Sequence, residues 1–141
     1  MGILEELYQE LVLTRYKAPQ KRGTLPNPTH KSGGKNPACG DQIELYLKVE
    51  DGTIAAVRYQ GEGCAVSQAS ADLMAEAVEG KTVAEALELA KKFKAMVVEG
   101  RPPAPELGDL AALAGVAKLP SRVKCATLAW HALEEALGEG A

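Results

Sequence analysis

The chain has 141 residues, a formal net charge of −3 and 25% charged residues. This length suits one hydrophobic core, so we expect residues 1–141 to form a single domain. Acidic and basic residues are interspersed, and no apolar run approaches the ~18 residues needed to span a bilayer. We therefore expect neither nucleic acid nor a membrane as a partner.

The first segment is acidic and amphipathic rather than a signal peptide, and the cysteine count of three is odd. Both features predict a reducing compartment in which thiols stay free, so we expect a cytoplasmic protein.

A helix is predicted over Ile3–Tyr16, because apolar residues recur on one face of it: Ile3, Leu4, Tyr8, Leu11 and Val12. Residues Lys17–Ala38 are rich in Pro, Gly, Asn, Thr and Lys and show no period. This composition predicts an extended, mobile connector beside which function often lies.

A β-hairpin follows the connector. Apolar residues alternate with polar ones up to Glu50, Asp51-Gly52 is a turn signal, and a second strand is expected from about Thr53 to Gln60. A two-residue turn places Cys39 opposite Cys64. A register one residue longer, with Thr53 in the turn, aligns Ala55, Val57 and Tyr59 with the face of Leu47, Leu45 and Ile43. We favour the longer register because it buries more apolar surface.

The second half of the chain predicts helices. One begins at Cys64 and stops at Gly80, and another is capped by Thr82 and ends before Arg101–Pro105. A short helical piece around Leu107–Ala114 precedes a last helix after Pro120-Ser121, with an apolar stripe of Ala126, Ala129, Trp130, Leu133 and Leu137. The predicted class is therefore α+β, a small antiparallel sheet of two or three strands covered by several helices.

Three cysteines and an aspartate form a candidate metal site. Either hairpin register brings Cys39, Asp41 and Cys64 within about one residue of each other across the ribbon. Cys125, near the start of the last helix, completes a tetrahedral set of three thiolates and one carboxylate for zinc or iron.

The surroundings of these residues favour thiolates. Cys64 and Cys125 lie near predicted helix N-termini, where unpaired amides and the helix dipole favour negative charge. Arg122 or Lys124 can offset part of the site's charge. Three glycines permit the close turns that let distant ligands wrap one ion, namely Gly40, Gly61 and Gly63.

Asp41 suggests a reactive site rather than a closed structural one. A carboxylate binds a thiolate-rich centre less strongly than a thiolate does, which predicts a displaceable ligand. Other interpretations remain open: the cysteines can be small buried hydrophobes, Asp41 can simply start a strand, and Arg122 and Lys124 can be solvated. We expect neither His30 nor His131 to be a ligand.

At four motifs the sequence resembles the U-type iron–sulfur cluster assembly scaffolds (IscU and SufU), and most closely the SufU-like branch. The match covers nearly the whole chain, and its carriers are Arg15–Pro19, Asn36–Asp41, Gly61–Ser70 and Lys124–Leu128 with Trp130. Two features differ from the IscU pattern. Lys124 replaces a histidine before the third cysteine, and Leu119–Lys124 replaces the chaperone-recruiting Leu-Pro-Pro-Val-Lys stretch.

The resemblance implies that zinc is held by Cys39, Asp41, Cys64 and Cys125. It also implies that Cys39, Cys64 and Cys125 can hold a nascent iron–sulfur cluster, 2Fe–2S or another type. The implied partners are a pyridoxal-phosphate cysteine desulfurase of the SufS or IscS type, which donates persulfide sulfur, and downstream assembly or apo-acceptor proteins.

The predicted function is thus iron–sulfur cluster assembly, as a scaffold or as a zinc-dependent sulfur acceptor, with Cys39 as the persulfide acceptor candidate and Cys125 as a second catalytic candidate. Whether sulfurtransferase activity makes the protein an enzyme stays open. The alternative is a zinc-stabilised interaction module without sulfur chemistry.

Overall fold

A computed structural model describes the backbone of residues 3–36 and 40–138, and within these ranges the side chains from residue 10 onward. In this part of the chain a three-stranded antiparallel sheet in the order β1-β2-β3 is combined with four α-helices and one 3-10 helix. The elements in chain order are α1 (Ile3–Lys17), β1 (His30–Asn36), β2 (Asp41–Glu50), β3 (Thr53–Glu62), α2 (Ala65–Val78), α3 (Val83–Glu99), η1 (Pro105–Lys118) and α4 (Pro120–Ala136). The predicted α+β class is confirmed.

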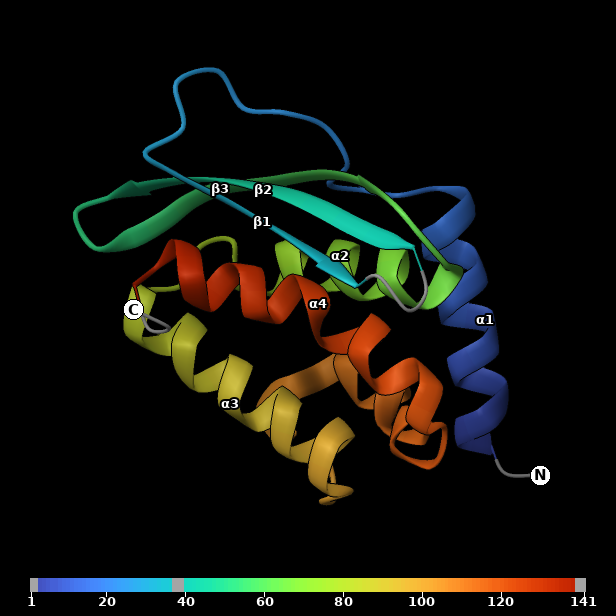
Figure 1. The fold of residues 1–141 in the computed structure, drawn as a ribbon. Helices are drawn as coiled ribbons and strands as arrows, with labels where there is room; N and C mark the ends of the chain where they lie inside the picture. The colour runs from blue at the N-terminus through green and yellow to red at the C-terminus, as the bar shows by residue number, and fades with distance from the viewer. Residues whose placement is uncertain (1–2, 37–39, 139–141) are drawn as a thin grey trace.

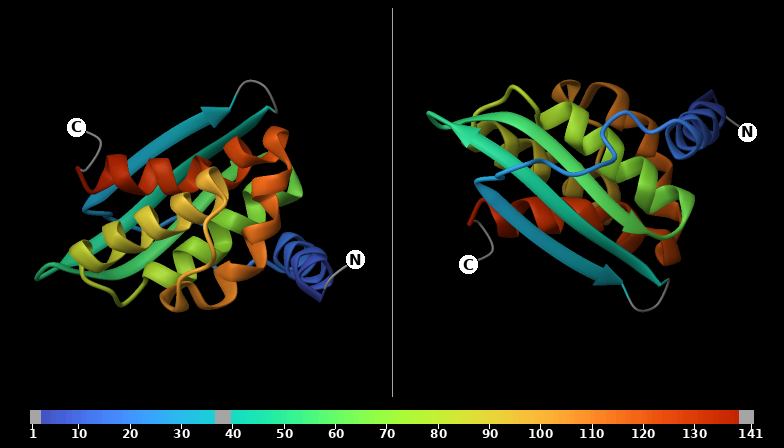
Figure 2. Two further views of the ribbon diagram at one scale, coloured as in Figure 1. Left: turned by 90° about the horizontal axis from the view of Figure 1, so that it is seen from below. Right: turned by 90° about the horizontal axis from the view of Figure 1, so that it is seen from above.

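The helices cover one face of the sheet. In Figure 1, α2 and α4 lie directly beneath the strands, α3 lies below them, and α1 stands at the side. Helix α2 contacts β3, whereas α4 contacts β1 and β2. The segment between α1 and β1 crosses the opposite face, as the view from above in Figure 2 shows, and the Gly23 amide donates to the Tyr59 carbonyl at 2.7 Å.

Strand β1 was not predicted, since its residues fall in the segment expected to be a connector without regular structure. It pairs with β2 along its whole length, from His30 opposite Leu47 to Asn36 opposite Asp41. Helix α4 packs closely against its inward face at Gly34, where a Cβ would lie 3.1 Å from Leu128 Cδ1. Small and polar residues on both faces hide the alternation by which a strand is recognised.

The β2–β3 hairpin combines features of both registers considered. Val57 faces Leu47 and Tyr59 faces Leu45, so the longer register is correct along most of the ribbon. The turn itself has two residues, because Glu50 pairs with Thr53, and a bulge at Lys48/Val49 joins the two registers. As a consequence Ile54 is buried and Ala55 is exposed, contrary to the expected inward position of Ala55.

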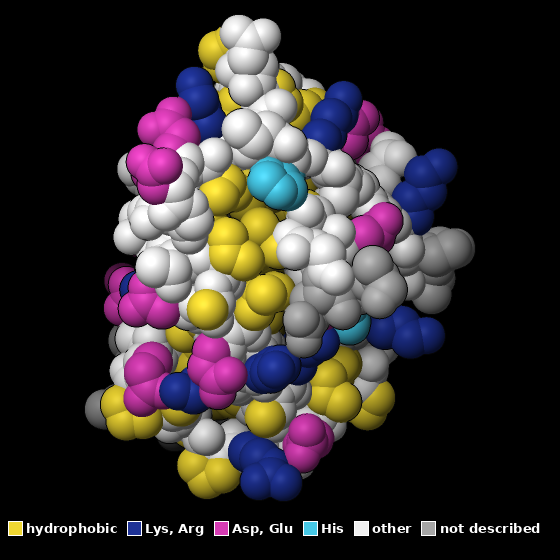
Figure 3. Space-filling model, turned by 90° about the vertical axis from the view of Figure 1, so that its left-hand side faces the viewer, with side chains coloured by type: hydrophobic (Ala, Val, Ile, Leu, Met, Phe, Trp, Pro, Cys, Tyr) yellow, Lys and Arg dark blue, Asp and Glu magenta, His cyan; other side chains and the backbone are white. Residues whose placement is uncertain are grey.

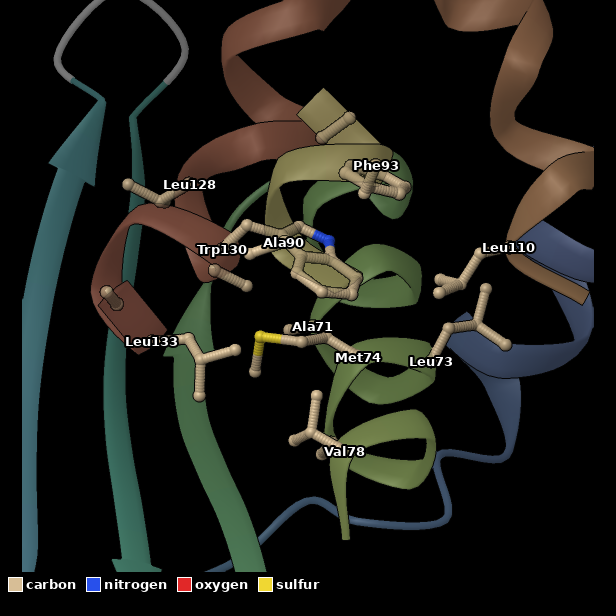
Figure 4. Packing of buried hydrophobic residues seen from close by; sticks show 14 of the residues in the cluster. Ala71, Leu73, Met74, Val78, Ala90, Phe93, Leu110, Leu128, Trp130 and Leu133 are labelled. Atoms are coloured by element: carbon tan, nitrogen blue, oxygen red, sulfur yellow. The ribbon is translucent and has the colours of Figure 1, made fainter. Parts of the chain in front are cut away.

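The core lies between the sheet and the helices. Phe93 of α3 stacks on Trp130 of α4 with ring centroids 4.6 Å apart, and the two side chains lie beside Ala90 and above Met74 in Figure 4. The Trp130 indole donates to Ser70 Oγ at 3.3 Å, and this hydroxyl donates to the Ala126 carbonyl at 2.6 Å. These two hydrogen bonds hold α2 against α4.

Helix boundaries mostly agree with those expected. Thr82 and Glu85 form the reciprocal capping box of α3, and the predicted stripe of α4 is buried except at Leu137, which is partly exposed. The segment after the proline-rich break is longer than expected and forms a 3-10 helix over Pro105–Lys118. It bends at Gly108, whose φ of 53° and ψ of −126° are non-helical.

A fully buried carboxylate joins α1 and the segment after it to α2. Asp72 accepts hydrogen bonds from the amides of Gln20 and Lys21, from the Tyr59 hydroxyl at 3.2 Å, and from Arg15 Nη1 at 2.9 Å. Arg15 also binds Glu76. The carboxylate of Glu76 raises the pKa of the Arg15 guanidinium most, and that of Asp72 raises it further. We call this set of contacts the Asp72 cluster.

Figure 3 views the molecule from the side of the β2–β3 turn. Lys and Arg side chains lie interspersed with Asp and Glu, and hydrophobic side chains are visible between them. Among the described helices, none is both long and apolar enough to cross a membrane.

Candidate metal centre

Three of the four predicted ligands converge. Asp41 is the first residue of β2, Cys64 is the N-cap of α2, and Cys125 lies on α4. One ligand atom from each of them lies within 4.8 Å of the others. Any two ligand atoms of a tetrahedral zinc are about 3.8 Å apart when both bonds have the length typical of zinc and sulfur, so a small contraction would close this set around one ion.

The fourth predicted ligand, Cys39, belongs to residues 37–39 and lies outside the described residues. Its role as a ligand and as the persulfide acceptor therefore stays a prediction.

The two oxygens of Asp41 are in different situations. Oδ1 accepts from the Cys64 amide at 2.9 Å and from Ser67 Oγ at 3.3 Å. Oδ2 is buried and has no hydrogen-bond partner in the described part of the chain. A buried carboxylate oxygen without a partner is unfavourable by about 1–3 kcal/mol or more, so this atom fits a bound cation.

Close packing requires glycine at two of the three positions where glycines were expected to shape the site. A Cβ on Gly61 would lie 2.1 Å from the carbonyl oxygen of Gln42, and one on Gly63 would lie 2.2 Å from Asp41 Oδ1. Gly40 has open space around it but adopts a φ of 71°, which L side chains rarely adopt. The expectation that glycines shape the site is borne out by this geometry.

The two described cysteines differ in exposure and in helix position. Cys64 is partly exposed and occupies the N-cap of α2, as predicted. Cys125 is fully buried and lies in the second turn of α4, beyond the unpaired amides of the first turn, so the expected helix-start effect is wrong for this thiol. Its Sγ instead accepts from Asn36 Nδ2 at 3.8 Å and donates to the Ser121 carbonyl at 3.9 Å.

Of the two cations considered as charge partners, Arg122 interacts with the site. The charge of Cys64 and a hydrogen bond with Cys125 raise the pKa of its guanidinium. His131 lies away from the site and is exposed beside Glu134, as expected, and His30 lies on β1 with its Nδ1 2.9 Å from the Thr29 hydroxyl.

Sequence reasoning did not identify Ser67 or Asn36 as residues that support the site. The sequence does contain a signal for Ser67, because a residue three positions after Cys64 lies on the same face of the helix that Cys64 opens. Asn36 had none, since its contact with Cys125 depends on strand β1, which was itself not predicted.

Comparisons with known proteins agree with the fold and with the family that the sequence resembles. The sequence matches the family described as NifU-like N-terminal domain over residues 7–139. It is 39% identical over 138 residues to the zinc-dependent sulfurtransferase SufU of Bacillus subtilis, covering 96% of this chain and 92% of the relative. It is 43% identical over 139 residues to the iron–sulfur cluster assembly scaffold protein IscU of Streptococcus pyogenes, covering 98% of this chain and 87% of the relative.

Solved structures give the same result. The crystal structure of a SUF-system scaffold protein, SufU of Fervidobacterium islandicum, superimposes with a TM-score of 0.87 at 36% identity, covering 96% of this chain and 99% of that one. The N-terminal part of a NifU-like protein from Brucella abortus has the same fold, with a TM-score of 0.87 at 23% identity. The chain therefore belongs to the family of NifU-like N-terminal domains that includes the SufU and IscU proteins.

Proposed function

We propose that this protein serves iron–sulfur cluster assembly by accepting sulfur at a zinc site formed by Cys39, Asp41, Cys64 and Cys125. The observation that carries the proposal is the buried Oδ2 of Asp41, which has no hydrogen-bond partner among the described residues and lies in a cluster with two cysteines from distant parts of the chain. The names of the relatives support both roles, zinc-dependent sulfurtransferase and assembly scaffold.

The donor set fits zinc. Three soft thiolates and one harder carboxylate form a four-ligand site, in which bound zinc keeps the thiols deprotonated at neutral pH. Arg122 lowers the net negative charge of this set through its contacts with the two described cysteines. Asp41 is the ligand expected to bind most weakly and to exchange with a side chain of a partner.

The sulfur donor that we propose is a pyridoxal-phosphate cysteine desulfurase carrying a cysteine persulfide. The thiolate of Cys39 attacks the outer sulfur of that persulfide, and a new sulfur–sulfur bond forms on Cys39. The original bond breaks, and its electron pair leaves with the desulfurase thiolate. No external oxidant or reductant is consumed. Cys125 is fully buried, which favours a ligand role for it over first contact with a partner.

As a scaffold, the same three cysteines would hold a nascent 2Fe–2S or other cluster as cargo for downstream apo-acceptor proteins. Thiolates are the usual ligands of such clusters, and in this role the cysteines would bind the cluster in place of zinc.

The experiment that tests the carrier role measures desulfurase turnover with and without the zinc-loaded protein. We expect stimulation, and by mass spectrometry a mass increase of one sulfur that is located on Cys39 and is absent from Cys39→Ser. If turnover does not change and no persulfide forms, the carrier role is rejected. Anaerobic incubation with iron and sulfide, followed by absorption spectroscopy, tests the scaffold role separately.

The alternative, a zinc-stabilised interaction module, makes the opposite prediction for one variant. Asp41→Cys would make a closed four-thiolate site, which tightens zinc binding. A purely structural site tolerates this change, whereas a sulfur-transfer site that depends on ligand exchange loses its stimulation of the desulfurase.

The proposal includes a single domain over residues 1–141 that works in the cytoplasm. One continuous cluster of buried side chains drawn from the sheet and the helices supports the first point, and the odd number of cysteines, three, supports the second.

A further inference from the structure

Within the part of the chain that the structure describes, hydrogen bonds hold the carboxylate of Asp41 at one oxygen, Oδ1. Both donors to Oδ1 come from the start of α2: the amide of Cys64, which is the N-cap, and the hydroxyl of Ser67 in the first turn. Ser67 is 5% exposed, so water does not readily replace its hydroxyl. Oδ2 is left as the oxygen available to a cation.

The Ser67 hydroxyl has a second acceptor within reach. Its oxygen lies 3.3 Å from Asp41 Oδ1 and 3.0 Å from the carbonyl oxygen of Cys64. A hydroxyl carries one proton, so it donates to one of these acceptors at a time. The donor is therefore satisfied both when Asp41 is in place and when Asp41 has moved away.

The packing around Asp41 restricts its carboxylate further. Gly63 leaves room for Oδ1, since a Cβ there would lie 2.2 Å from Oδ1 and 2.6 Å from Ser67 Oγ. The carboxylate thus lies in a space formed by the Gly63 backbone, the Cys64 amide and the Ser67 hydroxyl.

We infer that Ser67 is a positioning residue that sets how firmly Asp41 holds the metal ion and how fast it lets go. By occupying Oδ1, Ser67 directs Oδ2 toward the ion as a single-oxygen ligand. By turning to the Cys64 carbonyl, it leaves no buried donor unpaired when Asp41 is released, so that ligand exchange is not opposed by an orphaned hydroxyl. This inference rests on the proposed metal centre and extends it to a residue that is not a ligand.

The test measures zinc release from the full-length, zinc-loaded protein to a chromogenic chelator by stopped-flow absorbance. Loss of a group that orients a metal ligand typically weakens metal binding by about 10- to 100-fold. We expect Ser67→Ala to release zinc about tenfold faster than the wild type, and Ser67→Thr, which keeps the hydroxyl, to stay near the wild-type rate. Alanine favours helices, so α2 is expected to form in Ser67→Ala.

Ser70→Ala is the matched control. It removes the same atom from the same helix, but that hydroxyl bonds Ala126 and Trp130 in the core rather than Asp41. We expect Ser70→Ala to lower the melting temperature while zinc release stays unchanged. The absorption bands of the cobalt(II)-substituted protein give a second readout, and we expect them to shift in Ser67→Ala but not in Ser70→Ala.

The outcomes separate the two proposals. If wild-type protein binds zinc and Ser67→Ala releases it at the wild-type rate with an unchanged cobalt spectrum, the role of Ser67 is refuted and the metal centre stands. If Ser70→Ala accelerates release as much as Ser67→Ala does, the effect is general loosening of α2 and the inference is also refuted. If wild-type protein binds no zinc, both proposals fail.

Discussion

The Asp72 cluster gives a prediction whose size can be worked out from its contacts. Asp72→Ala removes the acceptor of four donor groups. Two of them, the backbone amides of Gln20 and Lys21, lie near the surface and can donate to water instead. The Tyr59 hydroxyl and the Arg15 guanidinium are more enclosed, with 1% of Tyr59 and 12% of the Arg15 side chain exposed. Each enclosed donor left without a partner is unfavourable by about 1–3 kcal/mol.

We therefore expect Asp72→Ala to lower the free energy of unfolding by about 3–5 kcal/mol, the range for breaking a buried ion pair from one side. Glu76→Ala is the matched control, because it removes the other carboxylate bound by Arg15, whose side chain is 45% exposed. An exposed pair contributes about 0–1 kcal/mol. The two variants should thus differ severalfold although both remove a partner of the same guanidinium.

Urea unfolding followed by the fluorescence of Trp130, the single tryptophan and a fully buried one, measures both variants. In thermal unfolding, about 3 °C per kcal/mol is expected for a chain of this size, so Asp72→Ala should melt about 9–15 °C lower. Equal losses in the two variants, or a loss under about 1 kcal/mol for Asp72→Ala, would refute the reasoning that the buried carboxylate joins α1 to α2.

Three further predictions concern single groups. Burial, and after it the charge of Asp72, raises the pKa of Tyr59 above its ordinary value of 10.0. Above pH 10 the unfolded chain therefore binds fewer protons than the folded protein, and the free energy of unfolding falls by up to about 1.4 kcal/mol per pH unit. Urea unfolding at pH 9 and pH 11 should show a smaller fall in this free energy for Tyr59→Phe than for the wild type. In metal-free protein, Arg122→Gln should slow alkylation of the site thiols at pH 7 by roughly two- to fivefold, and Lys124→Gln should have little effect, as iodoacetamide kinetics will show. Gly63→Ala should lose zinc during dialysis, because the new methyl group overlaps a ligand, whereas Gly115→Ala, with open space around it, should retain zinc; retention by both variants would contradict the packing described.

Much of the fold could be predicted because local signals agree with it. The capping box at Thr82, the turn at Asp51-Gly52 and the apolar stripe of α4 each specify structure over a few residues. Strand β1 has no such signal, because its pairing with β2 and its packing against α4 determine its structure, and tertiary contacts of this kind leave little mark on the local sequence.

The candidate site follows the same division. The hairpin alone predicted that Asp41 and Cys64 would meet, since residues at the open end of a ribbon are neighbours. The approach of Cys125 depends on how α4 lies across the sheet, which the residue pattern does not give. Cys125 was included because its thiolate completes a four-ligand set, and the family resemblance implied the same role. The division of the Asp41 oxygens between Ser67 and the open position required side-chain geometry.

The described ligands come from a strand, the start of one helix and the interior of another, all far apart along the chain. An ion bound by all of them would fasten the sheet to two helices, and because the denatured chain does not hold these side chains together, the free energy of metal binding adds to the free energy of folding. Metal loading and thermal resistance are then two readings of one equilibrium, so stripping the ion weakens the very packing that assembles its ligands.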